Sequence, residues 1–169
     1  MENLSHYCKI NGLDCSVVIP QQYNGYENVK FKCMCGKIFI TSTDKFLNGK
    51  NRCNDCSNRM SNIEFKVESF LIDNNLNYVK QKKFKDCYYK KVLPFDFYLE
   101  EYNLLIEVQG QQHYEPLDYF GGDKGFTLQQ KRDTIKRNYC IYHNINLLEL
   151  PYWEFDNDNY IDILKKYLT

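Results

Sequence analysis

The sequence predicts an α/β domain with a mixed central sheet flanked by helices, preceded by a small cysteine-rich β module. From Ser61 onward, apolar and amphipathic segments follow in the order helix, three strands, helix, strand, helix. Helices that bracket strands in this way are typical of layered α/β folds. Before Ser61, four cysteines stand in two close pairs. The chain has 169 residues with 15 Tyr and 11 Phe, enough for a packed core.

Composition excludes several classes of protein. The formal net charge is zero, so bulk charge cannot hold this chain to nucleic acid and any basic surface must be local. No apolar run approaches the roughly 18 residues of a membrane span, and the first residues lack a signal-peptide core. We therefore expect a soluble, cytoplasmic protein with no membrane partner. In that setting, eight Cys indicate metal ligands or thiols rather than disulfides.

The first 60 residues are expected to form a lead-in, residues 1–16, and a zinc-ribbon-like module, residues 17–60. Short runs of β-branched and aromatic residues between Asn and Gly predict strands. The expected elements are strands at Ser16–Pro20, Val29–Lys32 and Ile38–Ile40, with a turn at Gln21–Asn28.

The cysteine pairs of this module predict a structural zinc site. Cys33 and Cys35 precede Gly36, and Cys53 and Cys56 form a CxxC. Four thiolates can close a tetrahedral Zn²⁺ site that supplies folding energy and leaves no open position for catalysis. The glycine would permit a tight knuckle turn. Because CxC is less usual than CxxC, another donor could replace one member of the first pair: His6, Cys8 or Cys15. The alternative is four unrelated thiols.

The predicted α/β domain, residues 61–169, begins with a capping box. Ser61 as N-cap is followed three residues later by Glu64, and the apolar face of the helix ends at Asp73–Asn75. Capping explains Glu64 completely, and a role in an active site is the other interpretation.

A basic stretch follows the first helix. A strand at Leu76–Phe84 runs into Lys80–Lys91, which holds six Lys and one Asp. This stretch is either a solvated hairpin or an edge that contacts phosphates. With two cations of a later helix, the second interpretation gives a nucleic-acid-binding set of Lys80, Lys82, Lys83, Lys85, Lys90, Lys91, Lys131 and Arg132.

Two apolar runs, Phe95–Leu99 and Leu104–Val108, flank a four-residue connection and predict a β-hairpin. In that register Asp96 lies directly opposite Glu107. Opposed Cβ atoms are about 4.5–5.5 Å apart, and like charges there destabilise the pair. A divalent cation between the two carboxylates would remove the repulsion, because hard cations take carboxylate oxygens as ligands.

The segment after this hairpin supplies further polar residues and the remaining elements. The carbonyl of Val108 could complete the coordination of the cation, and Gln109 would point to the same face as Glu107 because strand side chains alternate. The remaining expected elements are a loop at Glu115–Gly125, a basic helix at Phe126–His143, a strand at Ile145–Leu150 and a helix at Asp158–Leu168.

From Ser61 to Thr169, these pieces resemble the PD-(D/E)xK nuclease superfamily, and within it the Vsr-like branch that includes phage homing endonucleases of the EDxHD type. The cysteine-rich segment resembles zinc ribbons found ahead of such domains in phage proteins. The matching segments are SNIE with Glu64, LPFDFYL with Asp96, LLIEVQGQQHY with Glu107, Gln109 and His113, and KRDTIK with Asp133 and Lys136.

The resemblance implies a restriction-endonuclease-like core that cleaves double-stranded DNA with Mg²⁺ or Mn²⁺. Asp96 and Glu107 would be metal ligands, and Glu64 would assist at the metal or the water. His113 would be a general acid or base, and Asp133 and Lys136 would orient it or contact the scissile phosphate. Gln109 stands where the superfamily usually has Lys. Glutamine can position water but lends no positive charge, so Lys131 or Lys136 would supply it.

Other interpretations remain open. Gln109 and the zero net charge favour a catalytically weak or inactive nuclease-fold module that binds DNA or a protein partner. RNA cleavage is not separated from DNA cleavage. His113 could be an exposed loop residue, and Asp133 could form a helix-surface ion pair with Lys136 or Arg137. A homodimer would suit double-strand cutting, although no heptad or symmetric patch indicates one.

Overall fold

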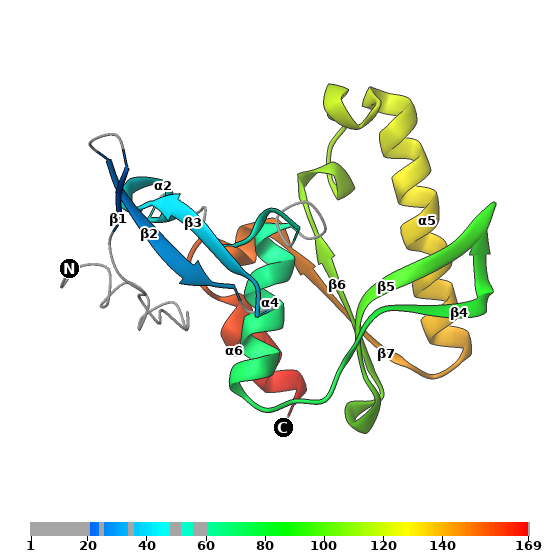
Figure 1. Ribbon diagram of the computed structural model, residues 1–169. Coiled ribbons are helices and arrows are strands. Elements are labelled where there is room, and N and C mark those ends of the chain that lie inside the picture. Colours follow the sequence, from blue (N-terminus) through cyan, green and yellow to red (C-terminus); the bar gives the residue numbers. More distant parts are fainter. Residues whose placement is uncertain (1–20, 24–25, 34–35, 48–51, 56–60, 169) are drawn as a thin grey trace. The chain divides into compact units, whose positions relative to one another are not determined.

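The structure is a computed structural model in which the chain forms two compact units (Figure 1). The units are Met1–Phe65 and Lys66–Thr169, and the division falls inside one helix. The residues that the structure describes are 21–23, 26–33, 36–47, 52–55 and 61–168. The predicted lead-in, residues 1–16, lies outside them.

The first unit contains a three-stranded antiparallel sheet in the order β1-β2-β3. Its elements are β1 (Gln21–Tyr23), β2 (Tyr26–Lys32), β3 (Ile38–Ser42) and the short helix α2 (Thr43–Leu47). The predicted turn at Gln21–Asn28 is wrong, because Gln21 pairs with Asn28 in a hairpin. The overlooked signal was the Asn-Gly dipeptide between β1 and β2, which marks a two-residue connection. The strand at Ile38–Ile40 is confirmed, and Ser16–Pro20 lies outside the described residues.

The second unit contains a four-stranded mixed sheet in the order β4-β5-β6-β7, which confirms the predicted mixed sheet. The first three strands pair antiparallel, and β6 pairs parallel with β7. The strands are β4 (Val79–Tyr89), β5 (Lys91–Leu99), β6 (Leu104–Gln109) and β7 (Asn146–Pro151). A parallel neighbour requires a crossover, and the long helix α5 (Gly122–Tyr142) supplies it.

Helices flank this sheet on both sides, as predicted. Figure 1 shows α5 on one side, with α6 (Tyr160–Tyr167) and the C-terminal part of α4 (Asn62–Asp73) on the other. Helix α5 begins four residues before the predicted Phe126, because left-handed Gly121 (φ +91°) ends the loop and its carbonyl accepts from the N–H of Gly125. Short 3-10 turns complete the unit: η1 (Glu100–Tyr102), η2 (Gln111–His113), η3 (Asp118–Phe120) and η4 (Tyr152–Phe155).

Strand β6 is the centre of the core. All six of its residues are buried, as expected for a strand covered on both faces. Two of the six, Glu107 and Gln109, are nevertheless polar. None of the described helices is long and apolar enough to cross a membrane.

Candidate functional site

Asp96 sits at an irregular point of the β4–β5 pair. Phe95 and Tyr98 both contact the ring of Phe84, at centroid distances of 5.9 and 6.1 Å. Residues three apart in a regular strand point to opposite faces of the sheet. The regular alternation of side chains along β5 is therefore interrupted between Phe95 and Tyr98. On β4, Gln81 lies level with Asp96 in the register and has a φ of +50°. Irregularities of this kind re-aim side chains and are common beside functional sites.

The Asp96 carboxylate is fixed by two hydrogen bonds. Its Oδ2 accepts from the backbone N–H of Val108 on β6 at 2.9 Å, and its Oδ1 accepts from the Gln81 amide at 3.1 Å. Burial raises the pKa of Asp96, and the Val108 N–H offsets part of that effect. The carboxylate is therefore held against β6, the strand that carries Glu107.

The predicted hairpin register is confirmed. Leu99 faces Leu104, and the pairing continues with the same offset to Phe97. The pairing ends there, so the placement of Asp96 directly opposite Glu107 stays a prediction, although Asp96 reaches the backbone of the neighbouring Val108.

Glu107 is a buried carboxylate with only one oxygen paired. Its residue is 5 % exposed, and its Oε2 accepts from Lys136 Nζ at 2.8 Å. Its Oε1 is buried without a hydrogen-bond partner among the described residues, which is a costly arrangement for a carboxylate. Burial raises the pKa of Glu107 to about 8; Lys136 lowers this pKa, while Asp96 and Asp133 raise it. The unpartnered oxygen is suited to accept a cation.

The donor set fits Mg²⁺ better than a metal that needs many protein ligands. The described residues contain no group of three or more His, Cys, Asp or Glu side chains arranged to hold a metal. Mg²⁺ commonly keeps several waters and binds through one or two carboxylates. Asp96 and Glu107 match that demand. The carbonyl of Val108 as a further ligand stays a prediction.

His113 and Asp133 form a dyad beside these carboxylates. His113 Nδ1 lies 2.9 Å from Asp133 Oδ2, and their side chains are only 11 % and 3 % exposed. Asp133 Oδ1 accepts from Gln129 Nε2 at 2.9 Å, and the Gln130 amide donates to the His113 carbonyl. The interpretations of His113 as an exposed loop residue and of Asp133 as a surface ion pair are therefore wrong.

The dyad and the carboxylates belong to one electrostatic cluster. His113 lowers the pKa of Asp96, and Asp133 raises that of Glu107. The carboxylate of Asp133 favours the imidazole tautomer with a proton on Nδ1, which leaves Nε2 as the basic nitrogen.

Gln109, on the same strand as Glu107, belongs to a second cluster between β6 and β7 in which its amide is fully engaged. It is 2 % exposed, its amide donates to Glu149, and its Oε1 accepts from the Tyr114 hydroxyl. Glu149 on β7 pairs with Glu107 in the parallel ladder. Arg137 Nε contacts both Glu149 oxygens, at 3.0 and 2.8 Å. The amide of Gln109 is thus engaged in holding β6 to β7.

Of the two lysines predicted to supply positive charge in place of Gln109, Lys136 is the one that contacts a predicted metal ligand, Glu107. Besides its contact with Glu107, its Nζ lies 5.2 Å from the centroid of the Phe95 ring. The other candidate, Lys131, lies instead over the Tyr89 ring at 4.9 Å.

Sequence reasoning missed several members of these clusters. Glu149 had a visible signal, because it is the only charged residue of β7 and stands between Leu148 and Leu150. Arg137, Tyr114, Gln129 and Gln81 carried none, since their roles depend on the crossover of α5 and on the irregularity in β4.

In the first unit, Glu64 forms the predicted capping box. Its backbone N–H donates to Ser61 Oγ at 3.2 Å, and the Ser61 N–H donates to Glu64 Oε2 at 3.3 Å. The capping role is confirmed, and the role in catalysis stays a prediction.

The knuckle turn predicted in the first unit is present. The Cys33 N–H donates to the Lys37 carbonyl at 2.8 Å, and Gly36 has a φ of +83°. Cys33 and Cys53 are buried together, with the Cys53 N–H 3.5 Å from Cys33 Sγ. An N–H directed at sulfur suits a thiolate, so this half of the site fits Zn²⁺. The other five candidate ligands lie outside the described residues: His6, Cys8, Cys15, Cys35 and Cys56.

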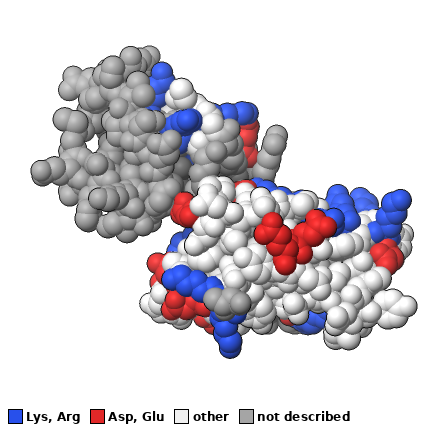
Figure 2. All heavy atoms as spheres, turned by 90° about the horizontal axis from the view of Figure 1, so that it is seen from below, with Lys and Arg blue, Asp and Glu red and all other residues white. Residues whose placement is uncertain are grey.

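Five of the eight predicted nucleic-acid-binding cations form two groups. Lys80 is paired with Glu68 at 2.9 Å, and Lys82 lies over the rings of Phe84 and Tyr98. A second group lines a pocket between the β4–β5 turn and α5: Lys90, Lys91 and Arg132. On the face shown in Figure 2, the described acidic and basic side chains lie in small groups, some of them side by side, among mostly uncharged atoms.

Comparisons with known proteins identify viral relatives. The chain is 37% identical over 73 residues to "Uncharacterized protein 094L" of frog virus 3 (isolate Goorha), which covers 42% of this chain and 47% of the relative. It is 37% identical over 70 residues to "Uncharacterized protein 307L" of invertebrate iridescent virus 6, covering 41% and 36%. The match thus spans less than half of either relative. No family model matches the chain, and no solved structure matches it significantly.

Proposed function

We propose that this chain is a metal-dependent DNA endonuclease with a PD-(D/E)xK core of the Vsr-like, EDxHD type. One observation carries the proposal: Glu107 leaves one buried carboxylate oxygen unpartnered next to the fixed carboxylate of Asp96. The His113–Asp133 dyad and Lys136 lie in the same electrostatic cluster. An acid pair, a base and a cation are the groups that hydrolysis of a phosphodiester requires.

Each group would have a separate task. Asp96 and Glu107 would hold Mg²⁺, which would supply Lewis acidity for the hydrolysis. His113, oriented through Nδ1 by Asp133, takes a proton from the attacking water at Nε2. Lys136 places positive charge beside the metal ligands and offsets the charge that develops on the phosphate.

The N-terminal module would support this domain with a structural Zn²⁺ site. Cys33 and Cys53 are two of its ligands, and the sequence supplies Cys35 and Cys56 as the others. Such a module would add contacts to double-stranded DNA. The metal content of the purified protein tests this role: about one Zn²⁺ per chain is expected, reduced by Cys53→Ser.

A plasmid-cleavage assay tests the catalytic proposal. Supercoiled DNA with Mg²⁺ should be nicked or linearised by the wild-type chain and left intact by Asp96→Asn. The matched control is Asp162→Asn, which makes the same change at an exposed position of α6 and should keep full activity. Undiminished cutting by Asp96→Asn, or no cutting by the wild type with Mg²⁺ or Mn²⁺, would refute the proposal.

The second candidate is a nuclease-fold module that binds DNA or a protein without cleaving it. It is favoured by Gln109, whose amide is occupied by Glu149 and Tyr114 where the superfamily usually has a lysine. Calorimetric titration with Mg²⁺ and Mn²⁺ separates the two candidates. Binding that Glu107→Ala abolishes supports the nuclease, and no binding to the wild type supports the module.

A further inference from the structure

A pocket of about 430 Å³ between the β4–β5 turn and α5 is lined by four cations and no carboxylate. Lys90 and Lys91 come from the turn, and Arg132 and Lys136 come from α5. Gln129 also lines the pocket. Because Lys136 contacts Glu107 and Gln129 contacts Asp133, this pocket adjoins the candidate catalytic cluster.

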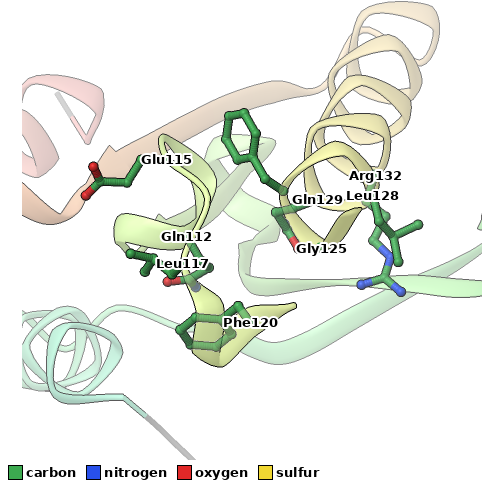
Figure 3. Close-up of a pocket in the computed structure, with 9 residues that line it drawn as sticks. Gln112, Glu115, Leu117, Phe120, Gly125, Leu128, Gln129 and Arg132 are labelled. Atoms are coloured by element: carbon green, nitrogen blue, oxygen red, sulfur yellow. The ribbon is translucent and has the colours of Figure 1, made fainter. Parts of the chain in front are cut away.

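Arg132 is the most informative of these cations. Its Nε is buried and has no hydrogen-bond partner among the described residues, so the guanidinium is incompletely satisfied. Arg132 also lines a smaller pocket, shown in Figure 3, in which Glu115 lies on the opposite side. Glu115 accepts instead from the Gln111 amide. The nearby carboxylate of this pocket therefore does not satisfy Arg132.

The lysines of the turn also lack acidic partners. Lys90 and Lys91 form no ion pair within the part of the chain that the structure describes. Lys80 on the same strand pair, in contrast, is neutralised by Glu68 at 2.9 Å. The left-handed φ of Lys90, +57°, makes the turn that brings these side chains to the rim of the pocket.

We propose that this pocket binds a backbone phosphate that flanks the scissile one, so that the chain acts faster on polynucleotides than on isolated phosphodiesters. The inference rests on the proposed function and names its substrate class. A guanidinium presents its donors in a planar fork that matches phosphate oxygens, and its Nε can join such a contact. The lysines add charge that neutralises a polyanion. Lys136 and Gln129, shared with the catalytic cluster, connect the two sites.

The first test measures binding without cleavage. Fluorescence anisotropy of a labelled duplex oligonucleotide is followed in EDTA at several salt concentrations. Arg132→Gln should weaken binding about tenfold and reduce the slope of log K against log salt by about 1, the signature of one lost phosphate contact. Lys165→Gln on exposed α6 is the matched charge control and should leave binding unchanged.

The second test measures turnover on two substrates. Arg132→Gln should lower kcat/KM for the duplex about tenfold and leave hydrolysis of bis(p-nitrophenyl) phosphate unchanged, because that compound has no flanking phosphate. Lys91→Gln should act in the same direction with a smaller effect. Circular dichroism checks that each variant is folded, and Lys91→Gln replaces Arg132→Gln if the arginine variant fails that check.

The outcomes distinguish this inference from the proposed function. Unchanged affinity and salt slope in the pocket variants overturn the inference, even where the wild type cleaves DNA. The inference is also overturned if polyglutamate displaces the labelled duplex as well as an unlabelled oligonucleotide of matched charge does. The pocket would then select negative charge and not phosphate. If the wild-type chain never cleaves DNA but the pocket variants bind it more weakly, the proposed nuclease activity is refuted and phosphate binding by the pocket is supported.

Discussion

Two ion pairs, Glu107–Lys136 and Glu149–Arg137, lie side by side in the second unit. We call the first the open pair, because one Glu107 oxygen has no hydrogen-bond partner among the described residues. We call the second the closed pair, because both Glu149 oxygens are bonded. Glu107 and Glu149 are neighbours in the parallel β6–β7 ladder, and their partners Lys136 and Arg137 are consecutive residues of α5. Each pair has a contact of 2.8 Å. Arg137 reaches both oxygens of Glu149, and Gln109 adds a further donor. Glu107 keeps one oxygen without a partner among the described residues.

The difference shows which carboxylate is structural and which is suited to function. The side chain of Glu149 is 26 % exposed, and its hydrogen bonds tie β6, β7 and α5 together. The side chain of Glu107 is 6 % exposed and yet less well satisfied. A folded chain gains nothing in stability from a buried, half-paired carboxylate. Such an arrangement is expected where a site is held ready for a ligand.

The largest expected effect follows from removing the charge of the open pair. Glu107→Gln should lower Mg²⁺-dependent cleavage by about 10⁴-fold or more, in the range seen for essential catalytic groups. Glu149→Gln should keep cleavage within about tenfold, because it alters a neighbouring structural contact. Rates on supercoiled plasmid, with folding checked by thermal denaturation, compare the two. Equal losses in both variants would show that the two pairs act alike.

The next effect concerns the His113–Asp133 dyad. His113→Gln should slow cleavage by about 10²-fold, because the water loses its general base. Calorimetric Mg²⁺ affinity should stay unchanged in this variant, which places the loss in the chemical step and not in the metal site. Asp133→Asn should reproduce most of the loss, since it no longer selects the tautomer with the proton on Nδ1. Wild-type cleavage by His113→Gln would exclude His113 as the base.

The pH dependence of stability separates the two carboxylates without any activity. Because the pKa of Glu107 rises from 4.5 to about 8 on folding, the folded chain binds more protons than the unfolded chain between these values. Stability should therefore fall as pH rises from about 4.5 to about 8, which should appear as a decrease in Tm. Glu107→Gln should remove this component, and Glu149→Gln should retain it. Mg²⁺ should raise Tm more at pH 8 than at pH 6, since it binds the deprotonated carboxylate.

The open pair was predictable from sequence because its determinants are local. Two apolar runs and a four-residue connection set the register that pairs Leu99 with Leu104 and brings Asp96 against the strand that carries Glu107. The mixed sheet and its flanking helices followed from the order of periodic segments. His113 and Asp133 were found through a resemblance, and only the crossover of α5 explains why they meet.

The closed pair was not predictable, because it depends on strand order. Nothing in the sequence states that β7 pairs parallel with β6 and brings Glu149 beside Glu107. For the same reason, the sequence predicts only that Gln109 can position water. Its partner Glu149 is distant in sequence, and its partner Tyr114 follows the short turn η2. The positive φ of Gln81 (+50°) was not predictable either, because Gly and Asn are the residues usually found at positive φ.

The smallest expected effect tests why the two pairs use different cations. Arg137→Lys keeps the charge but replaces a guanidinium that contacts both Glu149 oxygens with a single ammonium. We expect a loss of about 1 kcal/mol in the free energy of unfolding, measured by urea denaturation, and cleavage within about threefold of wild type. The converse change, Lys136→Arg, should be tolerated in stability and harmful to metal binding, because a fork could satisfy both Glu107 oxygens and close the open pair. Metal affinity unchanged in Lys136→Arg would show that the free Glu107 oxygen is not where the cation binds.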